Sequence, residues 1–83
     1  MNEDDIWQRL TAVFRDVFDD DRIVIAPETT ARDIEGWDSL ANIELLVAIE
    51  KSFGRIKFNT GEVANLRNVG ELVAAIKRKT GRN

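Results

Sequence analysis

Residues 36–54 read GWDSLANIELLVAIEKSFG, and this segment sets the architecture expected for the chain. Its apolar side chains recur at close to the helical period, which predicts a helix over residues 39–53. Gly54 follows as a stop signal, because glycine commonly ends helices. The core face of this helix is expected to contain Ile43, Leu45, Leu46, Ile49 and Phe53. The opposite face is expected to expose Leu40, Glu44, Val47 and Lys51, which also follow helical spacing.

An amphipathic helix is predicted at the start of the chain, over residues 3–18. Asn2 is a suitable cap, and acidic residues occupy the first turn, where the helix dipole favours negative charge. The apolar stripe consists of Ile6, Leu10, Val13, Phe14, Val17 and Phe18. A stripe of this kind nearly always packs into the core of a domain.

Two shorter helices are predicted after residue 54. The sequence contains two pairs that resemble capping boxes, Asn59 with Glu62 and Asn68 with Glu71. The first pair predicts a short helix over residues 60–66, and the second predicts a closing helix over residues 69–79. The stripe of the closing helix consists of Val69, Leu72, Val73 and Ile76.

The segment over residues 19–38 has no helical period, and Pro27 and Gly36 interrupt it, so a long loop is predicted there. A short strand over residues 23–25 is an alternative for part of it. Three apolar side chains are expected to pin the loop to the core, namely Ile23, Ile25 and Ile34. The sequence therefore predicts one all-α domain over residues 1–83. The predicted fold is a four-helix bundle with a short third helix and a long loop between helices 1 and 2.

The composition narrows the possible functions. The 83 residues are 43% hydrophobic and 33% charged, which is typical of a small folded domain rather than of a disordered tail. Cysteine and histidine are absent, which excludes disulfides, thiolate nucleophiles, zinc fingers and histidine-based triads. The sequence also suggests no paired-carboxylate cleft and no calcium loop. The protein is therefore expected to be neither an enzyme nor a metal protein.

Charge is unevenly distributed along the chain. Residues 1–50 contain 13 acidic and 4 basic residues, whereas residues 51–83 contain 2 acidic and 8 basic residues. The acidic leading part repels phosphate backbones, so nucleic acid is not an expected partner. The apolar runs are far shorter than the ~18 residues that cross a bilayer, and no signal peptide follows Met1. A cytoplasmic protein without a membrane span is expected.

Ser39 is the side chain best placed for covalent modification. The chain has two serines, and Ser52 is inside the predicted helix, whereas Ser39 begins it. Backbone N–H groups and the dipole at a helix start stabilise a phosphate ester. Ser39 is not expected to act as a nucleophile by itself, because histidine is absent and Asp38 is too weak a base. The alternative is that Ser39 simply caps the helix.

The run from Gly36 to Gly54, with Asp-Ser-Leu near its start, resembles the signature of acyl carrier proteins and related thiolation domains. The chain length, the long loop, the short third helix and the closing segment at residues 68–72 fit the same family. The resemblance implies that a phosphopantetheinyl transferase attaches 4′-phosphopantetheine from coenzyme A to Ser39. It also implies a monomeric carrier that holds acyl groups as thioesters on this arm.

The resemblance further implies a docking surface on the second helix. Many fatty-acid carriers have Asp at the position of Ala41 and Glu at the position of Lys51, so the acidic stripe is thinned here. A changed interface charge alters selectivity and suggests a specialised rather than a housekeeping carrier, although both positions are equally compatible with an ordinary helix surface. The implied partners are acyl-loading, condensing and acyl-transfer enzymes. The implied recognition residues are Asp38, Leu40, Glu44, Val47, Lys51 and Glu62, and Asp38 could equally be a helix cap.

Three functions are compatible with these patterns. The first is a discrete acyl carrier in fatty acid, specialised lipid or polyketide biosynthesis. The second is an aminoacyl or peptidyl carrier of a nonribosomal-peptide-type pathway, with which the motif at residues 36–40 also agrees. The third, from a different class, is an unmodified helical adaptor that binds a partner through Leu40 and Val47.

Overall fold

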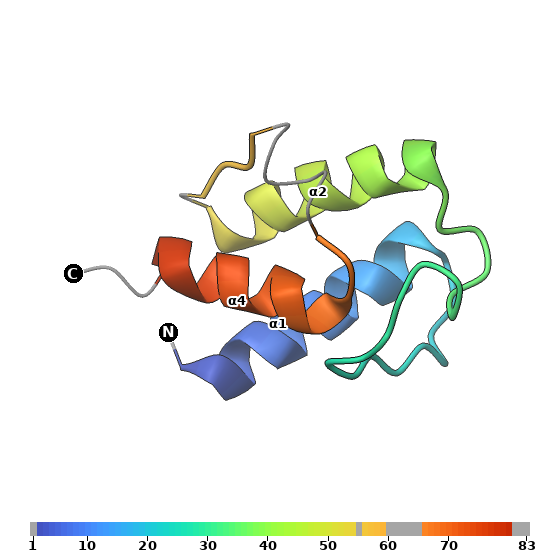
Figure 1. Ribbon diagram of the computed structural model, residues 1–83, viewed down its shortest axis with the longest axis horizontal. Coiled ribbons are helices and arrows are strands. Elements are labelled where there is room, and N and C mark those ends of the chain that lie inside the picture. Colours follow the sequence, from blue (N-terminus) through green and yellow to red (C-terminus); the bar gives the residue numbers. More distant parts are fainter. Residues whose placement is uncertain (1, 55, 60–65, 81–83) are drawn as a thin grey trace.

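The computed structural model describes residues 2–54, 56–59 and 66–80. Within these ranges the chain forms three α-helices and no strand: α1 over Glu3–Val17, α2 over Ser39–Phe53 and α4 over Val69–Thr80 (Figure 1). The predicted all-α class is therefore confirmed, and the three helix bounds agree with expectation to within one residue. The predicted short helix over residues 60–66 lies outside the described residues except for Leu66, which is not helical.

The helices begin where the capping residues predict. The side-chain oxygen of Asn2 accepts a hydrogen bond from the backbone N–H of Asp5 at 2.9 Å, and that of Asn68 accepts from Glu71 at 2.8 Å. The Glu71 carboxylate in turn accepts from the backbone N–H of Arg67 at 2.9 Å. Each cap satisfies one backbone donor that the first helical turn leaves without an internal partner.

One hydrophobic core joins the three helices, because α1 packs against both α2 and α4. The fully buried side chains include Phe14, Ile6 and Leu10 of α1, Leu45 and Ile49 of α2, and Val69 and Ile76 of α4. These positions recur at helical spacing, so each helix directs one face inward. Val17 and Phe18, at the end of the predicted first stripe, are only partly buried against this core.

The assignment of Ile43 to the core face of α2 is wrong, because this side chain is 60% exposed. The buried face of α2 contains Leu45, Leu46, Ile49 and Phe53. At about 100° per residue, Ile43 lies about 60° from Leu40 and about 40° from Val47 around the helix axis. Ile43 therefore belongs to the outward side of α2, which neither α1 nor α4 covers.

The long loop between α1 and α2 is held to the core at several points. Ile25 and Ile34 are buried and Ile23 is half-buried, as predicted. The alternative strand over residues 23–25 is wrong, since these residues form no strand and Val24 is 78% exposed. A side-chain hydrogen bond holds this part of the loop instead, with Nε of Arg15 donating to the carbonyl of Ile23 at 2.8 Å.

The loop also contacts the start of α4. The backbone N–H of Val69 donates to the carbonyl of Thr29 at 2.9 Å, and that of Gly70 donates to the carbonyl of Pro27 at 2.8 Å. Figure 1 shows this loop, in teal and green, beside the orange start of α4. Two of the backbone donors of the first turn of α4 thus find partners in a segment some forty positions earlier in the chain.

Replacing Gly70 by alanine is expected to destabilise the protein by about 1–3 kcal/mol. A Cβ atom at this position would lie 2.9 Å from the carbonyl oxygen of Pro27, which is a backbone atom that cannot swing away. In an exposed helix the same change would stabilise by about 1 kcal/mol. Urea unfolding measures the difference, with Ala74→Gly on the exposed side of α4 as the propensity control. A Gly70→Ala protein at least as stable as the wild type would contradict this packing.

The two ends of the fold are joined by an ion pair whose strength depends on pH. Nζ of Lys77 lies 3.1 Å from Oε1 of Glu3. The hydrogen bond from Lys77, a second from Trp7 and the charge of Lys77 hold the pKa of the Glu3 carboxyl below its usual value. Because the folded pKa lies below the unfolded one, the stabilisation is present near neutral pH and is lost as the pH falls through the folded pKa.

Glu3→Gln is therefore expected to flatten the acid side of the stability profile slightly. Thermal unfolding between about pH 7 and about pH 3 should show a smaller decrease in Tm for this variant than for the wild type. The effect is small because the pair is exposed to solvent. Glu28→Gln removes an exposed carboxylate that is in no ion pair among the described residues, and it controls for the change in net charge. Parallel profiles for the wild type and Glu3→Gln would show that the pair contributes nothing.

Candidate functional site

Asp38, and not Ser39, caps α2. The Asp38 backbone is extended, with φ −114° and ψ −170°, and its Oδ1 accepts from the backbone N–H of Ala41 at 2.8 Å. Its carbonyl accepts from the N–H of Asn42 at 2.8 Å. Ser39 is therefore the first helical residue, and the interpretation of Ser39 as a simple cap is wrong. A carboxylate is well suited to this position because it faces the positive end of the helix dipole.

The Ser39 side chain is exposed, and its hydroxyl has no hydrogen-bond partner among the described residues. The backbone N–H groups of Ser39 and Leu40 likewise have no partner there, and the Asp38 carboxylate accepts from Ala41 instead. A hydroxyl is thus presented at a helix start next to two available N–H donors. This arrangement can accept a phosphate ester without breaking an existing hydrogen bond.

Trp37 attaches this helix start to the core. Gly36 precedes it with φ 90°, a conformation that glycine adopts without strain. The Trp37 ring packs edge-on against Phe14 with ring centroids 5.2 Å apart, and its centroid lies 6.2 Å from that of Phe18. Its Nε1 donates to Oδ1 of Asn42 at 3.0 Å. The residue before the cap is therefore fixed both by aromatic packing and by a hydrogen bond.

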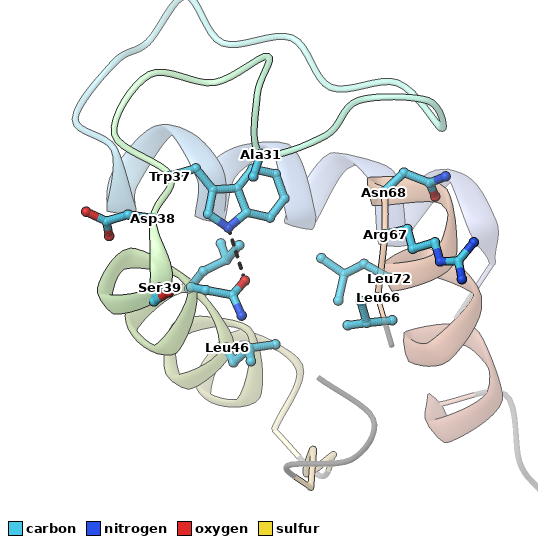
Figure 2. Close-up of a pocket in the computed structure, with 11 residues that line it drawn as sticks. Ala31, Trp37, Asp38, Ser39, Leu46, Leu66, Arg67, Asn68 and Leu72 are labelled. Carbon is cyan, nitrogen blue, oxygen red and sulfur yellow. Dashed lines mark hydrogen bonds between the residues drawn. The ribbon is translucent and has the colours of Figure 1, made fainter. Parts of the chain in front are cut away.

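A cavity of about 340 Å³ lies next to Ser39. Figure 2 shows Trp37, Ser39 and Leu46 on one side of it and Leu66 and Leu72 on the other. Its described lining consists of Ala31, Trp37, Asp38, Ser39, Asn42, Leu45, Leu46, Leu66, Arg67, Asn68 and Leu72. The cavity combines apolar side chains with a few polar groups, which is typical of sites for organic ligands of this volume.

The outward side of α2 carries the remaining predicted recognition residues that the structure describes. Leu40 is 66% exposed and Val47 is 46% exposed, and Glu44 and Lys51 are also exposed. With Ile43, the apolar members form a stripe along one side of the helix. We call Leu40, Ile43 and Val47 the α2 stripe. Glu62 lies outside the described residues.

Sequence reasoning missed three contributors to this site, namely Trp37, Asn42 and Ile43. Trp37 and Asn42 occur in the quoted motif, but nothing in their spacing indicated that the two side chains would meet. A tryptophan two residues before the predicted helix start was the available signal, because the N–H of an indole that becomes buried usually finds an acceptor.

Neither a membrane-spanning helix nor a metal-binding cluster occurs in the described parts of the chain. No helix there has both the length and the apolar character needed to cross a membrane. No group of three or more acidic side chains there is arranged to hold a metal ion.

Comparison with known proteins assigns the chain to a family. Residues 8–76 match the family described as "Phosphopantetheine attachment site". The solved structure of the holo acyl carrier protein from Geobacter metallireducens superposes with a TM-score of 0.85 and is 46% identical, covering 92% of this chain and 86% of that one. The chain belongs to the acyl carrier protein family. A curated acyl carrier protein of Thermosynechococcus vestitus is 28% identical over 79 residues, covering 95% of this chain and 96% of its own.

Membership of the acyl carrier protein family establishes two general properties of the chain. Acyl carrier proteins are carriers and not enzymes, and their cofactor is covalently attached 4′-phosphopantetheine. The start of α2 fits such a group, since an exposed hydroxyl and two N–H donors, none of them with a hydrogen-bond partner in the described ranges, lie beside a cavity.

Proposed function

We propose that Ser39 is the attachment residue and that the protein presents acyl groups to successive enzymes from this position. The observation that carries the proposal is that Asp38 caps α2, which leaves the exposed Ser39 hydroxyl without a partner among the described residues. The N–H groups of Ser39 and Leu40 and the dipole of α2 would stabilise the negative charge of the phosphodiester. When attached, the cofactor supplies a thiol that holds acyl groups as thioesters.

For the pathway, we favour fatty acid, specialised lipid or polyketide biosynthesis. The support for a specialised carrier comes from the charge of α2, which has no acidic residue in its first turn and has Lys51 in its last turn. A carrier that docked only through an acidic stripe would be expected to have carboxylates at the positions of Ala41 and Lys51 on this helix. The alternative is an aminoacyl or peptidyl carrier, and the substrates of the enzymes that load the protein would decide between the two.

The partner surface proposed here is the α2 stripe with the charged groups beside it. The stripe is apolar and exposed, which is unusual for three large side chains on one short helix unless they meet a partner. Glu44 and Lys51 lie beside it and would select partners by charge. The phosphopantetheinyl transferase and the acyl-loading, condensing and acyl-transfer enzymes are the proposed partners, with Asp38 and Glu62 as further contacts. The cytoplasmic location and the monomeric state stay predictions.

Mass spectrometry of the wild-type protein tests the attachment. The apo protein is incubated with coenzyme A and a phosphopantetheinyl transferase, and the intact mass is measured before and after. We expect a gain of one phosphopantetheinyl group, and fragmentation should place it on the peptide that contains Ser39. A protein that gains no mass with several transferases would instead support the unmodified helical adaptor, whose binding would depend on the α2 stripe alone.

A further inference from the structure

The side chain of Asn42 is fixed in one orientation by Trp37. Nε1 of Trp37 donates to Oδ1 of Asn42 at 3.0 Å, as the dashed line in Figure 2 marks. An indole N–H can only donate, so the amide oxygen of Asn42 must face Trp37 and the amide NH₂ group must face the other way. Trp37 cannot easily turn, because its ring packs against Phe14 and Phe18. The aromatic cluster thus determines the direction of the Asn42 amide.

The NH₂ group of Asn42 has no hydrogen-bond partner among the described residues. The side chain is nevertheless half-buried and lines the cavity beside Ser39. A donor that is oriented, partly removed from water and without a protein partner is able to bind an acceptor at little further cost in conformational freedom. A carbonyl oxygen is the simplest acceptor for an amide NH₂.

Building on the proposed attachment at Ser39, we propose that Asn42 donates a hydrogen bond to the pantoyl amide carbonyl of the phosphopantetheine arm. Asn42 follows Ser39 by three positions, so the two Cβ atoms lie about 5–6 Å apart on one side of α2. The pantoyl unit is the part of the arm next to the phosphate, and it ends in an amide carbonyl. On an arm attached to Ser39 this carbonyl would come within reach of Asn42, whereas the acyl group at the far end of an extended arm would not. Asn42 is then a binding residue, and Trp37 is its positioning residue.

Two variants test the role of the Asn42 NH₂ group and that of Trp37 separately. Asn42→Asp keeps an oxygen that can accept from Trp37 and removes the NH₂ group. Trp37→Phe keeps an aromatic ring against Phe14 and removes the N–H that orients Asn42. Gln8→Glu makes the same amide-to-carboxylate change at an exposed position of α1, away from the cavity, and controls for the added charge. Circular dichroism confirms that each variant is folded.

Nuclear magnetic resonance of the loaded proteins provides the test. Intact mass first confirms one phosphopantetheinyl group on each protein, and the pantoyl methyl groups of the arm carry ¹³C. We expect the side-chain NH₂ resonances of Asn42 to shift on loading. We also expect the pantoyl methyl groups to have the low mobility of the folded domain in the wild type and in Gln8→Glu. In Asn42→Asp they should become as mobile as in free pantetheine, and in Trp37→Phe their mobility should be intermediate.

The outcomes distinguish this inference from the proposed function. Unshifted Asn42 resonances on loading, or equal arm mobility in the wild type and in Asn42→Asp, would overturn the role of Asn42 and leave attachment at Ser39 intact. Equal ordering of the arm in Trp37→Phe and the wild type would overturn the positioning role of Trp37. A wild-type protein that gains no mass would overturn the attachment and the inference together.

Discussion

Ser39→Ala is expected to abolish phosphopantetheine attachment completely, from full modification of the wild type to none. The ester needs the hydroxyl oxygen, and Ser52, the other serine of the chain, is half-buried within α2. The fold should be unaffected, because Asp38 supplies the cap and alanine is compatible with a helical position. Intact mass after incubation with coenzyme A and a transferase measures the result.

Ser52→Ala is the matched control, since it makes the same chemical change one helix length away from the proposed site. This variant should gain one phosphopantetheinyl group as the wild type does. The circular dichroism spectrum of Ser39→Ala should match that of the wild type. A matching spectrum shows that the loss of modification is not caused by unfolding. A mass gain that persists in Ser39→Ala would place the modification on another residue and contradict the proposal.

Phe14→Ala is expected to lower the free energy of unfolding by about 3–5 kcal/mol, the range measured for buried aromatic truncations. Phe14 is fully buried in α1, and its ring contacts those of Phe18 and Trp37, with centroid separations of 5.9 Å and 5.2 Å. Natural domains are stable by only about 5–15 kcal/mol, and small ones lie at the low end. The variant should therefore lose most of its stability in a urea titration.

Val24→Ala is the control for Phe14→Ala, because it also removes apolar atoms but from a side chain that is 78% exposed. Its unfolding free energy should stay within about 0.5 kcal/mol of the wild type. If Phe14→Ala lost less than about 1 kcal/mol, the aromatic cluster would not be the packed centre described here. Such a result would also contradict the edge-on packing of Trp37 against Phe14.

The helices, and the position of Ser39 at the start of α2, could be predicted because their signals are local. Asn2 and Asn68 accept hydrogen bonds from residues three positions later, so the cap and its partner lie within one turn of sequence. The period of apolar residues in α1 and α4 likewise identified their buried faces without knowledge of any neighbour. Ser39 was proposed as the attachment residue from its motif. Its position at a helix start followed from the same local signals.

The details of the site were less accessible, because they depend on contacts between segments. Asp38 and Ser39 are both good caps, and only the structure showed that Asp38 takes this role. The contact of Trp37 with Phe14 joins the start of α2 to the last turn of α1. That packing in turn aims the indole N–H at Asn42, and nothing within one turn of sequence specifies it.

The sequence by itself determined the all-α class, the bounds of α1, α2 and α4, and the motif that contains Ser39. Tertiary structure alone decided that Ile43 is exposed and that Asn42 lines the cavity. The physical reason is the distance along the chain between the residues that interact. Caps and helical periods are satisfied by hydrogen bonds and spacings within a turn or two, whereas burial depends on which side of a helix its neighbours cover. On α2 that side is the one facing α1, and an apolar residue outside it stays in water.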